Sequence, residues 1–241
     1  MNQSCSRFAA VLLSLLLSAC SSPHGQPQEN SEPVAPSRIL EFATLYAENC
    51  AGCHGAEGRG GAALALANPV YLAIIDEPSM RKIITNGAHG TSMPAFAQNA
   101  GGMLTDEQID VISNGIFSRW AKKGILDGID KPSYTARNPG TTGNGELGYR
   151  MYCASCHGRG GQGGPTASAI INDSFLALVS DQALRTIIIT GRPELGAPDW
   201  RGNVPGKPMS DQEITDVVAW LASHRVQSPG QPYSAANNSP H

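Results

Sequence analysis

Cys50-Ala51-Gly52-Cys53-His54 and Cys153-Ala154-Ser155-Cys156-His157 are two copies of the pattern Cys-x-x-Cys-His in a chain of 241 residues. Two cysteines three residues apart lie on the same side of a helical turn, so both sulfurs can form thioethers with the two vinyl groups of one porphyrin. The histidine that follows then lies beneath the ring as an axial iron ligand. The pattern predicts two covalently bound haems (haem c), attached through Cys50, Cys53, Cys153 and Cys156, with His54 and His157 as axial ligands.

The same cysteine spacing without the histidine would suit thioredoxin-type redox chemistry or half of a zinc site. The adjoining histidine, the duplication and the export signal described next favour haem. The remaining two cysteines, Cys5 and Cys20, lie in the N-terminal leader. All six cysteines are therefore explained without a disulfide.

The N-terminus reads as an export signal. Arg7 precedes an apolar run over residues 8–17 that is too short to span a bilayer but typical of a secretory signal. The run ends in Leu17-Ser18-Ala19-Cys20, which resembles the processing site of bacterial lipoproteins. The resemblance implies removal of residues 1–19, lipidation of Cys20, and a place on the periplasm-facing side of the inner or outer membrane, with Ser21 favouring the outer one. An ordinary signal peptide cut near the same place is the alternative.

Two segments have the composition of disordered chain. Residues 20–37 are rich in proline and poor in large apolar side chains, and residues 228–241 have a similar composition. We expect the first to be a tether between anchor and folded part and the second to be a disordered tail.

The chain between tether and tail is an internal repeat. Cys50 aligns with Cys153, and after one inserted residue Asn68 aligns with Asn172. The alignment predicts two homologous domains, residues 38–130 and 143–227. The linker between them, residues 131–142, is marked by its proline, glycine and threonine content.

Each domain is predicted to be helical. We expect helices over residues 39–49 and 145–152 leading into the two Cys-x-x-Cys-His motifs, and middle helices over 78–86 and 180–190. The last helices begin at the N-caps Thr105 and Ser210, where Gln108 and Glu213 complete capping boxes. The glycine-rich runs after the two motifs lack helical periodicity and are predicted to be loops.

The order helix, Cys-x-x-Cys-His, glycine loop, middle helix, methionine loop and final helix resembles class I cytochromes c, and two such domains in tandem resemble the dihaem cytochromes c. The resemblance covers nearly all of residues 38–227. It implies an all-α fold in each domain and a methionine as the second axial ligand, a ligation that raises the reduction potential. In the first domain Met93, followed by Pro94, matches the ligand loop of the family.

The second domain departs from this pattern. Met93 aligns with Ala197, so the expected methionine is missing. Met209, directly before the N-cap Ser210, is a candidate ligand, while its other interpretation is a hydrophobic staple; an open, water-bound or otherwise ligated iron remains the alternative. Pro165 matches the proline of the family whose carbonyl accepts a hydrogen bond from the axial imidazole, and Ala62 takes that place in the first domain.

Composition limits the remaining functions. The chain has 17 Lys and Arg against 20 Asp and Glu, a formal charge of -3 to which haem propionates would add, so nucleic acid is not a natural partner. The leading interpretation is a lipid-anchored dihaem cytochrome that transfers single electrons in a bacterial respiratory or photosynthetic chain. Its partners would be a membrane electron-transfer complex, a soluble redox protein, or both. The alternatives are a dihaem oxidoreductase, peroxidase or thiosulfate dehydrogenase-like, with catalysis at the second haem, and a gas-binding sensor module.

Overall fold

The computed structural model describes residues 34–226, and the regular secondary structure in that range is helical. Two isolated β-bridges, Ala97 with Leu104 and Arg192 with Ala197, join loop segments. The all-α fold expected from the sequence is confirmed. None of the helices in this range has the length and apolar character needed to cross a membrane.

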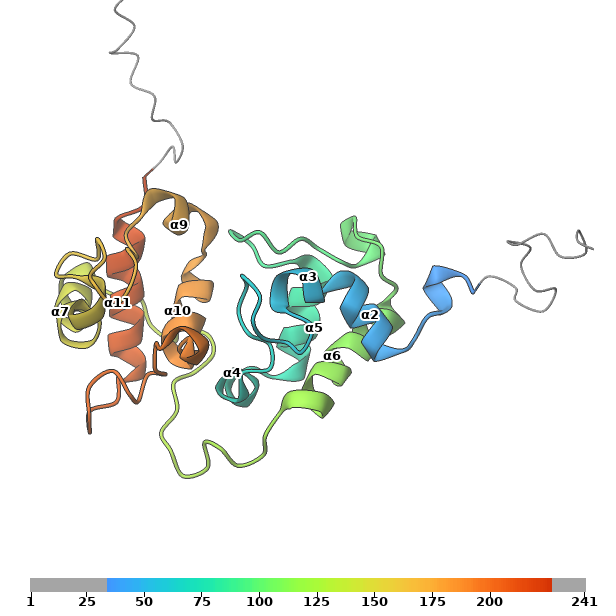
Figure 1. The fold of residues 1–241 in the computed structure, drawn as a ribbon, viewed down its shortest axis with the longest axis horizontal. Coiled ribbons are helices and arrows are strands. Elements are labelled where there is room, and N and C mark those ends of the chain that lie inside the picture. The colour runs from blue at the N-terminus through green and yellow to red at the C-terminus, as the bar shows by residue number, and fades with distance from the viewer. Residues whose placement is uncertain (1–33, 227–241) are drawn as a thin grey trace, which may run out of the picture. The chain divides into compact units, whose positions relative to one another are not determined.

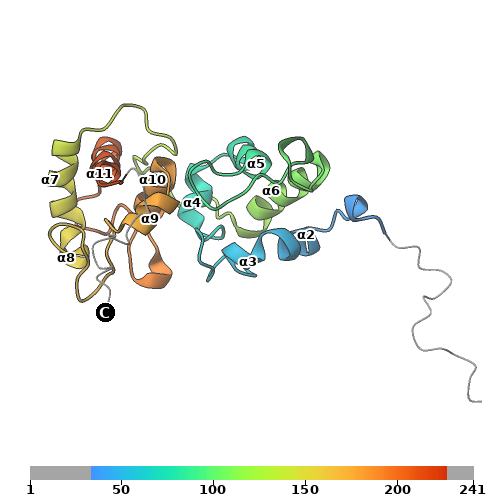
Figure 2. The same ribbon diagram turned by 90° about the horizontal axis from the view of Figure 1, so that it is seen from above.

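The helices form two sets with the same order along the chain, blue to green and yellow to red in Figure 1. The first set comprises α2 (Phe42–Asn49), α3 (Ala51–His54), α4 (Pro69–Ile74), α5 (Glu77–Asn86), the 3-10 turn η3 (Gln98–Ala100) and α6 (Asp106–Trp120). The second set comprises α7 (Thr142–Tyr152), α8 (Ala154–His157), α9 (Asp173–Leu178), α10 (Asp181–Thr190), the 3-10 turn η4 (Pro193–Leu195) and α11 (Asp211–Ser223). Figure 2 shows the same sets from above.

Several predicted segments fall outside this description. The leader 1–19, the lipidation candidate Cys20, most of the tether 20–37 and the tail 228–241 lie outside the described residues. The end of the tether is described, and it forms the 3-10 turn η2 (Pro36–Arg38). The predicted linker 131–142 runs between α6 and α7, and α7 begins at its last residue.

The helix starts follow their capping residues. Both capping boxes are confirmed: Thr105 caps α6 with Gln108, and Ser210 caps α11 with Glu213. The first helix was predicted to begin at residue 39, but it begins at Phe42, because the Glu41 carboxylate caps the backbone amides that follow. The sequence reading missed α4 and α9, which are only six residues long.

The first and last helices of each set cross where one residue is large and its neighbour is glycine. Phe42 of α2 lies against Gly115 of α6, where an added Cβ would come within 2.0 Å of the phenyl ring. In the second set the glycine is on the first helix and the large residue is on the last helix, because Gly145 of α7 lies against Trp220 of α11. Each crossing has room for one large side chain.

The buried apolar side chains form two cores, one for each set of helices, and the second core also includes Val70 and Leu126. A tyrosine of the first helix packs on a tryptophan of the last helix: Tyr46 on Trp120 with ring centroids 5.1 Å apart, and Tyr149 on Trp220 at 4.2 Å. Aliphatic side chains of the last helix fill the rest of both cores, among them Ile109, Ile112, Ile116, Ile214, Val217 and Leu221. Burial of these apolar faces stabilises the contact between the first and last helices.

We expect Gly145→Ala to lower the free energy of unfolding by about 1–3 kcal/mol, because the added Cβ would lie 2.0 Å from the backbone oxygen of Asp216 and the helices must separate. Gly143→Ala is the matched control. It lies on the same helix with no atom within 4 Å of the added Cβ, so it should be neutral or stabilise by up to about 1 kcal/mol. Urea unfolding of the purified protein measures both, and equal effects would contradict this account of the crossing.

Candidate haem sites

The two Cys-x-x-Cys-His motifs adopt the same backbone turn. Cys50 ends α2 with φ −121° and donates its amide to the carbonyl of Tyr46, and α3 follows at once. The amide of His54 returns to the carbonyl of Cys50 at 3.0 Å. Cys153 and His157 repeat the turn, with φ −123° at the cysteine and the same 3.0 Å bond.

The two cysteines of each motif differ in exposure. Cys50 and Cys153 are partly buried against their cores, whereas Cys53 and Cys156 are exposed. Burial, together with the neighbouring thiol, raises the pKa of Cys50 and of Cys153 to about 12. All four are free thiols in the described chain. Each motif therefore offers one sulfur from the interior and one at the surface.

A backbone carbonyl fixes the orientation of each motif histidine. Nδ1 of His54 donates to the carbonyl of Leu64 at 2.7 Å, and Nδ1 of His157 donates to the carbonyl of Ser168 at 2.8 Å. A ring with its proton on Nδ1 keeps the lone pair of Nε2 for a metal. Burial lowers the pKa of His54, which favours the neutral, ligating form. The chemistry of this donor set fits a haem iron.

The prediction that Pro165 supplies this carbonyl is wrong. The amide of Gly164 donates to the carbonyl of Ala167 at 2.9 Å, which closes a turn that contains Pro165. Ser168, the residue after this turn, places its carbonyl at the imidazole of His157. Ala62, the matching position of the first set, is likewise not the acceptor. Leu64 and Ser168 align with each other when the one inserted residue of the second domain is placed within its glycine loop. This alignment is the signal that could have identified both residues as the acceptors of the histidine hydrogen bonds.

A tyrosine supports each motif from the first helix. The hydroxyl of Tyr46 donates to the carbonyl of Gly55 at 3.0 Å, and that of Tyr149 to Gly158 at 2.5 Å. Burial raises the pKa of both phenols to about 12, so they remain donors at neutral pH. Both tyrosines stand four residues before the first cysteine of their motif. The sequence analysis missed this pairing, although the repeat displays it.

The loop after the middle helix holds Met93 in the first set and Ala197 at the equivalent place in the second. The amide of Ala88 bonds to the carbonyl of Met93 at 3.2 Å, and that of Arg192 to Ala197 at 2.9 Å. Met93 is partly buried and packs against the first core. The hydrogen bonds thus reproduce the alignment made from the sequence, and the second loop has no thioether at this place.

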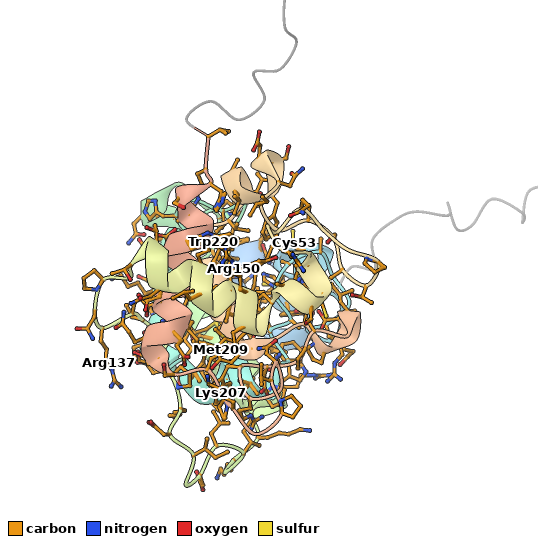
Figure 3. The ribbon with its side chains drawn as sticks, turned by 90° about the vertical axis from the view of Figure 1, so that its left-hand side faces the viewer. Cys53, Arg137, Arg150, Lys207, Met209 and Trp220 are labelled. Carbon is orange, nitrogen blue, oxygen red and sulfur yellow. The ribbon has the colours of Figure 1, made fainter. Side chains whose placement is uncertain are left out.

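Met209 occupies the position that Leu104 has in the first set. The amide of Leu104 bonds to the carbonyl of Phe96 at 2.8 Å, and that of Met209 to Trp200 at 3.0 Å. Met209 is 2% exposed within the second core, and Nδ2 of Asn203 lies 3.9 Å from its sulfur. Figure 3 labels Met209 and Trp220 among the side chains of this half. The sulfur of Met209 is therefore buried within the second domain, the domain in which Ala197 stands at the place of Met93.

The sites and the fold together define a protein built of two cytochrome c domains, whose cofactor is covalently bound haem c. Residues 37–114 and residues 140–221 match the model of one family, described as cytochrome c oxidase, cbb3-type, subunit III. The chain belongs to this family.

Two curated relatives are subunits CcoP of cbb3-type cytochrome c oxidases. The chain is 32% identical to that of Azospirillum sp. (strain B510) and 31% identical to that of Azospirillum brasilense, in each case over an alignment of 141 residues that covers 52% of this chain. The match covers 43% of each relative, so the chain spans less than half the length of these proteins.

A search of solved structures also gave matches. One is a chain of the reducing HAO-like protein complex of Kuenenia stuttgartiensis, with 18% identity, a TM-score of 0.46, and coverage of 77% of this chain and 96% of that chain. Another is the thiosulfate dehydrogenase of Marichromatium purpuratum, with 23% identity, a TM-score of 0.32, and coverage of 86% of this chain and 50% of that one.

Proposed function

We propose that this chain is a lipid-anchored dihaem c-type cytochrome that passes single electrons along a bacterial respiratory or photosynthetic chain, as a carrier or as a subunit of a membrane complex. The observation that carries the proposal is the repeated attachment turn, in which His54 and His157 each donate Nδ1 to a backbone carbonyl. Bound haem supplies a one-electron ferric/ferrous couple. The protein holds the group, orients its ligands and excludes water from it.

Each domain contributes the same set of proximal groups in this proposal. Cys50 and Cys53 bind one haem covalently, and Cys153 and Cys156 bind the other. His54 and His157, each with Nδ1 bonded to a backbone carbonyl, would offer Nε2 to a bound haem iron. The hydrogen bonds from Nδ1 fix the plane of each ring, and such contacts behind a metal ligand set its basicity.

The distal ligands differ between the domains. Met93 serves the first haem, because its loop occupies the place after the middle helix and its side chain faces the core. Met209 serves the second haem, because it is the methionine enclosed in the core of that domain. A thioether opposite a histidine raises the reduction potential and closes the iron to small molecules.

The partners follow from the relatives and from the N-terminus. The two relatives are named as subunits of cbb3-type cytochrome c oxidase, which supports a membrane electron-transfer complex as the partner of this chain. A lipid on Cys20 would hold the protein on the periplasm-facing side of the inner or outer membrane. The net negative charge argues against nucleic acid.

A second candidate function rests on Ala197. Because this residue replaces the methionine of the first domain, a second haem without Met209 as ligand would have an open coordination position. Such a haem could bind a substrate, as in a dihaem oxidoreductase of peroxidase or thiosulfate dehydrogenase type. The enclosed sulfur of Met209 favours the electron-transfer function over this alternative.

We expect the purified protein to contain two haems and to titrate in two one-electron steps, and we expect Met93→Ala to lower the potential of one of them. The shift should be about 0.1 V or more, because axial ligands span roughly 0.8 V in proteins. Met103→Ala is the matched control, since Met103 lies in the same loop region but is 82% exposed. Unchanged potentials in Met93→Ala would contradict the ligand assignment, and a haem-free protein would contradict the proposed function.

Carbon monoxide distinguishes the two candidate functions. We expect the reduced wild-type protein to bind none, because both irons have a thioether ligand. Met209→Leu should open the second haem to carbon monoxide while preserving the core, since the first domain has Leu104 at this position. Adding Ala197→Met should close it again. Rapid binding in the wild type that Met209→Leu leaves unchanged and Ala197→Met abolishes would favour the oxidoreductase.

The membrane anchor is tested separately. We expect Cys20→Ala to release the protein from the membrane fraction, or to block its processing, with the haem content per chain unchanged, because the first haem-attachment motif begins only at Cys50. Cys5→Ala is the control, since Cys5 would be discarded with the signal. Membrane attachment that survives Cys20→Ala would mean that a different segment anchors the chain.

A further inference from the structure

A buried arginine makes several of the contacts that bind the segment between the two domains to the second domain, and Gln182 and Asp216 make others. Arg185 of α10 is 2% exposed, and its guanidinium forms an ion pair with Asp211 at the start of α11. Nε and Nη2 also donate to the carbonyl of Ser133, at 3.2 and 2.9 Å, and Nε donates to that of Tyr134 at 3.2 Å. A planar guanidinium with five donors is suited to bind several oxygens at once.

The first domain contains the same ion pair without the linker. Arg81, the equivalent of Arg185, pairs with Asp106 and Asp110 of α6 and is 37% exposed. The arginine and its first acidic partner are therefore common to both repeats. What distinguishes the second domain is that linker backbone covers the pair and accepts hydrogen bonds from Nε and Nη2, while Nη1 donates to Thr215 of α11.

The linker also contacts the first domain. The ring of Tyr134 is partly buried against the first core, 6.4 Å from the ring of Tyr71. Lys131 donates to the carbonyl of Ala73 at the end of α4, at 2.8 Å. A chain of contacts thus runs from Arg185 through Tyr134 to the helix α4 of the first domain.

The two domains also touch directly along α4 and α10. Nδ2 of Asn68, the N-cap of α4, donates to the carbonyl of Thr190 at 3.2 Å, and Val70 is a member of the second core. The loop of Met93 approaches α10 as well, because an added Cβ at Gly90 would lie 3.3 Å from that of Ser180. α4 packs on α10 through buried apolar and polar groups together.

The equivalent face of the second domain is uncovered. Asn172 caps α9 as Asn68 caps α4, yet its side chain is exposed, and Leu178, the equivalent of Ile74, is 58% exposed. The pairing is thus a specific contact of α4 with α10, which the second copy of that helix does not make within the described residues.

We propose that Arg185 is a positioning residue that clamps the linker onto the second domain and thereby holds α4 against α10. Because of this clamp, the two domains keep a constant relative position and do not move independently. With haem bound in both domains, this contact would keep the two groups at a constant separation, which is what one-electron exchange between them would require. This electron-transfer step rests on the proposed function, whereas the clamp itself does not.

Limited trypsin digestion of the haem-loaded protein tests the clamp. Arg137 is an exposed linker residue that projects outward in Figure 3, and Arg137–Asn138 is a trypsin site. Cleavage requires that several residues of bound backbone open, so its rate follows the population of the undocked linker. We expect Arg185→Lys, which keeps the charge but loses the planar donors, to cleave at this bond about tenfold faster.

Arg81→Lys is the matched control and should cleave at Arg137 at the wild-type rate. Mass spectrometry identifies the bond that is cut, and haem content with thermal unfolding confirms that both variants are folded. Equal rates in Arg185→Lys and Arg81→Lys would overturn the clamp. Loss of haem from the wild type would overturn the proposed function and leave the digestion result valid.

A second pair of variants tests the domain contact without touching Arg185. Asn68→Asp keeps the capping oxygen of α4 but removes the donor to Thr190, while Asn172→Asp makes the same change on α9. We expect Asn68→Asp alone to broaden the interdomain distances measured by spin-label spectroscopy and to slow electron equilibration between the haems. Identical distance distributions and rates in both variants would overturn the inference.

Discussion

The close crossing of the first and last helices is the contact on which each domain depends. It needs one glycine and one large side chain, and the two domains meet this need in opposite ways, with Phe42 against Gly115 and Gly145 against Trp220. The attachment turn begins where the first helix ends, so the crossing also sets the place of both motif cysteines and of the histidine. Tyr46 and Tyr149 lie on the same helices and reach the carbonyl that follows each histidine.

Much of this arrangement could be predicted from the sequence, because local rules act on adjacent residues. The capping boxes at Thr105 and Ser210 depend on residues three apart. The place of Ala197 follows from an alignment without gaps over the middle helix and its loop, and the backbone bonds of Arg192 and Ala88 repeat it. These features need no knowledge of which segments meet in space.

The features that escaped prediction depend on contacts between distant segments. The carbonyl that orients His157 comes from Ser168, because a turn at Gly164 carries the chain past Pro165, and the position of a one-residue insertion within a glycine loop is not fixed by its sequence. Composition alone predicted that residues 131–142 form a linker. Its proline, glycine and threonine content described a non-helical segment correctly but did not reveal that the carbonyls of Ser133 and Tyr134 lie on a buried guanidinium.

The two domains share some structural features and differ in others. The helix crossing and the carbonyl behind each histidine are kept in both, whereas the distal loop, the face of α4 or α9, and the cover over the arginine differ. Burying a charged group is costly unless its donors are satisfied, so Arg185 could become buried only together with the linker backbone that satisfies it. Arg81 is consistent with that argument, because within residues 34–226 its ion-pair partners are Asp106 and Asp110, and its side chain remains 37% exposed. The burial of Arg185 in the second domain is thus a consequence of where the linker lies.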